Sequence, residues 1–159
     1  MDIDPRLHFV TATAIIEKDG KFLIVKRAPN EKAFPNKWTV PGGKLVYSDY
    51  KDMPHKTDFP QWYGMMEWLV RKEVREETGV EIERPAYVTD LVFVRPDGYP
   101  VVVFSFWAKY KSGEVVLNHE MTDFTWVTAE EAKAYDMISG IDEEIAKVAK
   151  LLRGQAAVF

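Results

Sequence analysis

Runs of apolar residues along the chain predict several β-strands. Residues 9–18 are rich in Val, Thr, Ala and Ile, and residues 21–27 contain four consecutive apolar side chains, which is typical of strands buried within a sheet. Asp19-Gly20 between them is a strong signal for a hairpin turn. Two long strands, a short strand and a final strand are expected further along the chain: 82–95, 101–111, 114–117 and 124–127.

Helical spacing of apolar residues predicts one helix in the middle of the chain. Three such residues lie four positions apart and form the stripe that should face the core: Met66, Val70 and Val74. The helix should begin near residues 61–64 and end at Thr78. Its end is predicted because Gly79 readily adopts the left-handed conformation that terminates helices.

The C-terminal part of the chain predicts further helical structure. The sequence from Thr128 to Glu131 is a capping box, which satisfies backbone N–H groups at a helix start and has a structural role. Residues 141–152 carry apolar side chains with helical spacing and predict the last helix, which Gly154 ends. The apolar tail over 156–159 either packs on the protein or contacts a second copy. Periodicity alone indicates an α+β arrangement.

Length and composition are those of a single soluble domain. The chain has 159 residues, of which 47% are hydrophobic and 29% are charged, and this is enough to bury a core. A net charge of −4 argues against a nucleic-acid partner, and no apolar stretch reaches the roughly 20 residues needed to cross a bilayer. Without a signal-peptide pattern or a membrane-spanning stretch, we expect a cytoplasmic protein. The lack of cysteine excludes thiolate chemistry.

Three carboxylates at the end of the predicted helix are the clearest sign of chemistry. Glu73, Glu76 and Glu77 stand at positions i, i+3 and i+4, which share one face of a helix. Like charges this close repel unless a cation lies among them, and hard divalent ions prefer such oxygen ligands. The alternative is a solvated acidic face whose counter-charges are Lys72 and Arg75. Because Glu73 and Glu77 lie beside the apolar stripe, we expect partial burial, whose cost a metal would offset.

The residues before this helix complete a known pattern. Residues 38–44 form a strand-like run with a Gly-Gly turn, and Asp49 follows six positions after Gly43. Together with the helix they resemble the signature of the Nudix hydrolase family in its MutT-like form: Gly, five residues, Glu, seven residues, then Arg-Glu-hydrophobic-x-Glu-Glu-x-Gly-hydrophobic. Gly43 matches the first Gly, Asp49 the isolated Glu and Lys72 the Arg. The remaining matches are Glu73, Glu76, Glu77, Gly79 and Val80.

Three features depart from that signature. Asp49 replaces Glu, which shortens the carboxylate by one methylene, so that Asp49 is expected to tie the loop to the helix rather than to touch metal. Lys72 replaces Arg, which exchanges a bidentate fork for a point charge. The gap between them spans 22 residues where the family has seven, which indicates an insertion of about residues 50–62. We expect this aromatic-rich segment to form an ordered loop over one side of the cleft, where it stacks a nucleobase or closes the site. The alternative is that its aromatic residues anchor the loop to the core or form a dimer contact.

The resemblance implies a fold and a set of site residues. The expected fold is an α/β/α sandwich, with a mixed β-sheet between helices, in one domain spanning residues 1–159. The expected metal is Mg²⁺, with Mn²⁺ as an alternative. Its ligands would be four carboxylates and one backbone carbonyl: Glu73, Glu76, Glu77, Glu120 and Gly43. Glu73 either binds the metal or orients and deprotonates water, and Lys72 holds Glu73 in place. Glu120 precedes the strand containing Trp126, where many family members carry an extra metal ligand or a base; the alternative is a surface glutamate.

The resemblance also implies hydrolysis of a nucleoside diphosphate linked to another moiety. The small size of the chain favours a nucleoside triphosphate, oxidised or not, that is cleaved to the monophosphate and pyrophosphate. An ADP-ribose or nucleotide-sugar pyrophosphatase is the alternative, and Pro96, 16 residues after Val80, is compatible with it, although Pro is also expected in a turn. A third hypothesis is a regulatory module that binds a nucleotide without turnover. Arg27 contacts phosphate or, as we favour, lies on the surface, and the resemblance is compatible with a homodimer.

Overall fold

The computed structural model describes residues 3–154, so the apolar tail over 156–159 lies outside the described residues. The elements in chain order are β1 (Phe9–Lys18), β2 (Lys21–Arg27), β3 (Trp38–Thr39), β4 (Gly42–Lys44), α1 (Tyr47–Tyr50), α2 (Met65–Thr78), β5 (Glu81–Ile82), β6 (Ala86–Val94), β7 (Pro100–Ser112), β8 (Met121–Val127), α3 (Ala129–Ala132) and α4 (Ile141–Leu152). The eight strands of this part of the chain form one sheet with the path β3-β2-β1-β7-β5, while β4 pairs with β1, β6 with β7, and β8 with β2.

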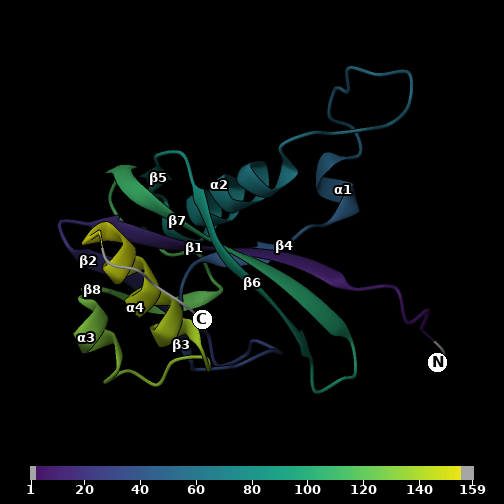
Figure 1. Ribbon diagram of the computed structural model, residues 1–159. Coiled ribbons are helices and arrows are strands. Elements are labelled where there is room, and N and C mark those ends of the chain that lie inside the picture. Colours follow the sequence, from purple (N-terminus) through teal and green to yellow (C-terminus); the bar gives the residue numbers. More distant parts are fainter. Residues whose placement is uncertain (1–2, 155–159) are drawn as a thin grey trace.

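The sheet is mixed, because β1 runs parallel to β7 whereas the other strand pairs are antiparallel. The parallel register extends from Phe9 opposite Val101 to Glu17 opposite Lys109. Helices α2 and α4 pack on opposite faces of the sheet (Figure 1). The predicted α/β/α sandwich with a mixed sheet is therefore confirmed.

Alternation along β1 divides the core into two layers. Ile15 packs in the layer that contains Ile145 of α4, whereas the next residue, Ile16, packs in the layer that contains Val74 of α2. Successive strand residues point to opposite faces of a sheet, and these four side chains are at most 1% exposed. Burial of each such side chain contributes about 1.5–3 kcal/mol to stability. The apolar stripe of α2 is thereby fixed against the sheet, which determines where its carboxylates point.

Helix α2 agrees with the prediction at both ends. It begins at Met65, directly after the predicted start, and it ends at Thr78. Gly79 has a φ of 72° and donates its N–H to the Arg75 carbonyl, as expected for a left-handed helix terminus. The helix therefore reaches the far end of the predicted box without a break.

The predicted strand over 114–117 is wrong. In that segment the N–H of Val116 donates to the Thr78 carbonyl at 2.8 Å, and the N–H of Asn118 donates to the Glu77 carbonyl at 3.3 Å. These are carbonyls of the last turn of α2, which have no partner within the helix. The segment caps the helix instead of pairing in the sheet, and this brings the loop that carries Glu120 toward α2.

Two other predictions need refinement. The strand expected over 82–95 is divided into β5 and β6, and the break at residues 83–85 contains Pro85, which has no N–H to donate to a sheet. The capping box at Thr128 is confirmed, since its Oγ1 accepts the N–H of Glu131 at 3.1 Å, but it opens only the one-turn helix α3. None of the helices within residues 3–154 combines the length and apolar character needed to cross a membrane.

The insertion after α1 packs mainly on itself. Trp62 lies edge-on to Tyr50 and to His55, with ring centroids 5.2 and 5.6 Å away, and its indole N–H donates to the Met53 carbonyl at 2.9 Å. Figure 1 shows the segment extending past the N-terminal end of α2 rather than back across the sheet. These contacts of Trp62 hold the segment to itself, while Phe59 and Tyr63 remain exposed. The role of the insertion stays a prediction.

Candidate active site

The Gly-Gly turn lies directly against the carboxylates of α2. A Cβ atom on Gly43 would overlap the carboxylate of Glu73, and a Cβ atom on Gly42 would overlap the Ala12 carbonyl of β1. The N–H of Gly42 donates to Oε2 of Glu77 at 3.4 Å. Glycine is therefore needed at position 42, where a side chain would meet the backbone of β1, whereas a side chain at position 43 would displace the carboxylate of Glu73.

Glu77 is the most buried of the predicted site residues. Its side chain belongs to the last turn of α2 and the residue is 2% exposed. Burial raises the pKa of the Glu77 carboxyl well above its usual value, and the negative charges of Glu73 and Glu120 raise it further, against the opposing effects of Gly42 and Arg27. An isolated buried carboxylate is costly, so this site calls for a cation or a proton.

Lys72 supplies a cation to the outer part of this cluster. Its ammonium lies 3.2 Å from Oε1 of Glu73, 3.1 Å from Oε2 of Glu76 and 3.5 Å from Oδ2 of Asp49. Burial alone would lower the pKa of Lys72, but the hydrogen bonds and charges of Glu76 and Glu73 outweigh it and raise that pKa. Burial raises the pKa of Glu73, although Lys72 opposes this shift. The ion pair with Asp49 also ties α1 to α2, as expected for this residue.

Glu120 lies close enough to these carboxylates to act on them electrostatically. Its negative charge contributes to the raised pKa values of both Glu73 and Glu77. The backbone holds the loop in place, since the N–H of Glu120 donates to Asn118 Oδ1 at 3.0 Å and its carbonyl accepts the N–H of Ala28 at 2.8 Å. The structure therefore brings Glu120 together with the helix carboxylates, while its chemical role stays a prediction.

The chemistry of this donor set fits a hard divalent cation. Carboxylates of α2 lie at the Gly-Gly turn, and Glu120 from the loop before β8 is close enough to act on them. Mg²⁺ and Mn²⁺ prefer such oxygens as ligands. As the side chains stand, no group of three His, Asp or Glu residues within residues 3–154 is arranged to hold a metal ion. The ammonium of Lys72 already pairs with two of these carboxylates, Glu73 and Glu76. Metal binding would therefore require these pairs to rearrange.

Three basic side chains act on one another near the site through their charges: Arg27, Lys44 and Arg95. The Arg27 side chain is not a free surface group, because Nε donates to the Ala33 carbonyl at 2.8 Å and a terminal nitrogen pairs with Glu31 at 3.2 Å. The sequence patterns do not single out Lys44 or Arg95. Lys44 directly follows the Gly-Gly turn, which was an available signal, whereas nothing local in the sequence connects Arg95 with it.

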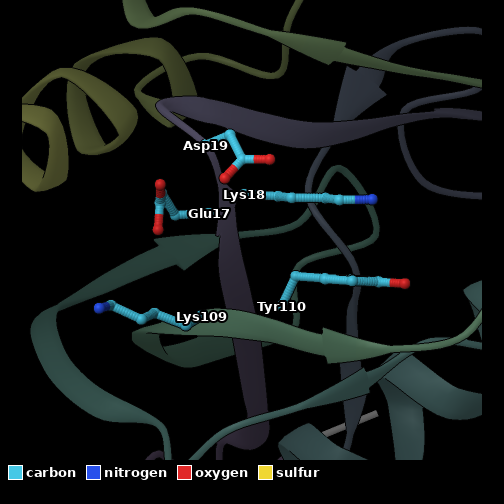
Figure 2. Close-up of a pocket in the computed structure, with 5 residues that line it drawn as sticks. All are labelled: Glu17, Lys18, Asp19, Lys109 and Tyr110. Carbon is cyan, nitrogen blue, oxygen red and sulfur yellow. The ribbon is translucent and has the colours of Figure 1, made fainter.

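A small surface hollow lies elsewhere, at the hairpin end of β1. Figure 2 shows the Lys18 and Tyr110 side chains running in the same direction, with Glu17 and Lys109 pointing the other way. The ammonium of Lys18 lies 4.3 Å from the centroid of the Tyr110 ring and 5.7 Å from that of Trp126. The Lys18 ammonium therefore already covers the faces of both rings. The residues that line this hollow include none of the predicted site residues, so it is not the candidate active site.

Comparison with known proteins gives relatives of one kind. No family model matches the chain. A nucleoside triphosphatase NudI from Klebsiella pneumoniae is 26% identical over 140 residues, which cover 82% of this chain and 89% of that protein. The crystal structure of a MutT protein from Methanosarcina mazei has a TM-score of 0.72 at 21% identity and covers 95% of this chain and 99% of that one. The NUDIX domain of Shewanella oneidensis NrtR, solved with ADP ribose, has a TM-score of 0.71 at 16% identity, with 95% and 94% covered.

The fold, the sequence pattern from Gly43 to Val80 and the similar proteins all indicate the same class of protein. The α/β/α sandwich places a Gly-Gly turn against a helix that carries Glu73, Glu76 and Glu77, and the relatives extend over most of the chain. The chain is similar to Nudix hydrolases over most of its length, and it has the fold of the MutT proteins among them. These relatives carry the names of a nucleoside triphosphatase and of a NUDIX hydrolase, and that family generally works with a divalent metal.

Proposed function

We propose that this protein hydrolyses nucleoside triphosphates, oxidised or not, to the monophosphate and pyrophosphate with the help of Mg²⁺, or alternatively Mn²⁺. The observation that carries the proposal is the meeting of Glu73 and Glu77 at the Gly42-Gly43 turn, with Glu120 close enough for its charge to act on both, because this repulsion calls for a cation. The relatives named nucleoside triphosphatase support this substrate class.

Each residue of the cluster has a proposed role. The metal ligands would be the Gly43 carbonyl and four carboxylates: Glu73, Glu76, Glu77 and Glu120. A bound divalent cation supplies charge neutralisation for the phosphates and a lower pKa for water. Glu73 is the proposed base or water-orienting group, because its half-buried carboxylate touches the turn and has a raised pKa. Lys72 keeps Glu73 in position at 3.2 Å, and Glu120 is the second candidate for a base.

A second candidate function is cleavage of ADP-ribose or a nucleotide sugar. The specific observation in its favour is the likeness to an NrtR NUDIX domain whose structure contains ADP ribose. Pro96 adds little, since it lies in the turn between β6 and β7, where proline is expected. A nucleotide-binding module without turnover has no comparable support, because all three helix carboxylates are present.

Initial rates across a substrate panel separate these functions. The panel contains the nucleoside triphosphates, their 8-oxo forms, ADP-ribose and nucleotide sugars, each assayed with Mg²⁺ and with EDTA. The proposed function predicts turnover of triphosphates that EDTA abolishes, with pyrophosphate rather than phosphate as the product. Faster turnover of ADP-ribose than of any triphosphate would favour the second candidate. Binding of nucleotides without turnover of any of them would favour the module.

A further inference from the structure

One end of the α4 face of the sheet lies outside the helix layer. Phe9, Thr11 and Ile15 are on the same side of β1, since they are separated by even numbers of residues. Ile15 packs against α4, but α4 does not extend along the strand to Phe9, and Figure 1 shows β1, β6 and β7 running well past that helix. Phe9 lies opposite Val101 of β7, near the middle of the sheet, and is nevertheless 37% exposed.

Two cations lie over the ring of this phenylalanine. The ammonium of Lys44 is 5.5 Å from the ring centroid and the guanidinium of Arg95 is 5.2 Å from it. These distances are within the range of favourable cation–π contacts. Lys44 comes from β4, where it lies opposite Thr11, and Arg95 comes from the turn after β6. The Phe9 ring therefore lies in contact with two cationic side chains, Lys44 and Arg95, that are far apart in the sequence.

The positive charge at this place is only partly compensated. Arg95 pairs with Asp97 at 2.6 Å, whereas Lys44 has no ion pair within residues 3–154. Burial lowers the pKa of Lys44, and the neighbouring charges of Arg95 and Arg27 lower it further. Two cations held beside each other favour an anion that bridges them, because it would remove their mutual repulsion.

This pair of cations borders the candidate active site. Lys44 follows Gly43 on β4, and its side chain points to the opposite face of that strand from Glu73. The two places are nevertheless close, since the charge of Arg27 acts on both Lys44 and Glu77. A polyphosphate chain that starts at the carboxylates can therefore reach Lys44 and Arg95 with a phosphate further along the chain. The carboxylates need a metal to approach phosphate, but these side chains bind it directly through charge-assisted hydrogen bonds.

We propose that Lys44 and Arg95, supported by the ring of Phe9, form an anion subsite for a phosphate group beyond the one attacked at the carboxylates. The proposal rests on the proposed function and deepens it. It makes the terminal phosphate of a nucleoside triphosphate a recognised group, and it disfavours ADP-ribose, in which both phosphates flank the anhydride and no terminal phosphate exists. Arg95 is then a specificity-determining residue for phosphate-chain length.

Binding of inorganic triphosphate, measured by calorimetry in EDTA, tests the subsite without turnover. Arg95→Gln and Lys44→Gln should each bind about 10- to 100-fold more weakly than wild type, which is the range for loss of one hydrogen bond to a charged group. Arg84→Gln is the matched control, because that arginine has an 88% exposed side chain on another part of the surface, and it should bind as wild type. Lys44→Gln breaks no ion pair, and thermal melts identify any variant that fails to fold.

Turnover separates a failure of the subsite from a failure of the proposed function. If wild type hydrolyses triphosphates, Arg95→Gln should raise KM about tenfold with kcat within about twofold, while Arg84→Gln changes neither. If wild type hydrolyses no triphosphate, the proposed function fails, and the calorimetry still decides the subsite. The subsite is overturned if wild type does not bind inorganic triphosphate, or if both glutamine variants bind it as tightly as wild type.

Discussion

Alanine substitutions at the two neighbouring glycines, Gly42 and Gly43, should separate folding from catalysis. A Cβ atom on Gly42 would approach the backbone carbonyl oxygen of Ala12 to 2.5 Å and the Cγ2 of Thr13 to 2.8 Å. A Cβ atom on Gly43 would meet the carboxylate of Glu73, which is the end of a flexible side chain. The first overlap can be relieved only by moving β4 away from β1, whereas the second can be relieved by rotating one side chain.

The magnitudes follow from these contacts. Gly42→Ala should lower the free energy of unfolding by about 1–3 kcal/mol, the usual cost of overpacking against backbone. Gly43→Ala should leave it nearly unchanged. Loss of the partly exposed Glu73–Lys72 pair costs at most about 1 kcal/mol, and the lower entropy of the unfolded chain offsets about 0.4–1 kcal/mol. Displacement of the Glu73 carboxylate by about 1 Å should nevertheless reduce kcat/KM roughly 100-fold.

Two measurements on each variant are sufficient. Urea denaturation gives the free energy of unfolding, and initial rates on the best triphosphate in Mg²⁺ give kcat/KM. We expect Gly43→Ala to be stable and nearly inactive, and Gly42→Ala to be measurably destabilised. A fully active Gly43→Ala enzyme would refute the placement of Glu73 in the reaction, and equal destabilisation of the two variants would refute the geometry of the turn.

Two further substitutions test other charged residues, Lys72 in the candidate site and Glu144 on α4. Lys72→Met should lower kcat/KM at least about tenfold because Glu73 and Glu76 lose their shared cation, and Lys72→Arg should restore activity; equal activity of both variants in the same rate assay would contradict this role. The pKa of Glu144, which is 4% exposed, is raised by burial above the unfolded value near 4.5, against the hydrogen bond from Ser105. Its folded-state ionisation is therefore unfavourable, so stability falls as pH rises from about 4.5 through the folded pKa. Glu144→Gln should gain stability relative to wild type between about pH 4 and pH 8 in urea denaturation, and a difference independent of pH would argue against the shift.

Local patterns were sufficient for the helix that carries the site. The stripe of Met66, Val70 and Val74 predicted α2, and Gly79 predicted its end, because both depend on interactions within one or two helical turns. The partial burial of Glu73 and Glu77 also followed from the same stripe, since helical geometry fixes which side chains are neighbours.

Contacts between distant segments could not be predicted in this way. The apolar residues at 114–117 suggested a strand, but their backbone caps α2, and this depends on how a loop returns to a helix more than 30 residues earlier in the chain. The meeting of Lys44 with Arg95 over Phe9 depends on the registers of β4 and β7 on β1. Strand register is set by the whole packed sheet rather than by any short stretch.

The most direct test of the central claim is the rate of triphosphate hydrolysis by Glu77→Gln in Mg²⁺ and in EDTA. Glu67→Gln is the matched control, since Glu67 is on the same helix but pairs with Arg71 outside the site. We predict that EDTA abolishes wild-type turnover, that Glu77→Gln loses at least about tenfold in rate with a melting temperature no lower than that of wild type, and that Glu67→Gln behaves as wild type. Turnover that persists in EDTA, or a fully active Glu77→Gln enzyme, would contradict a metal-dependent site built on these carboxylates.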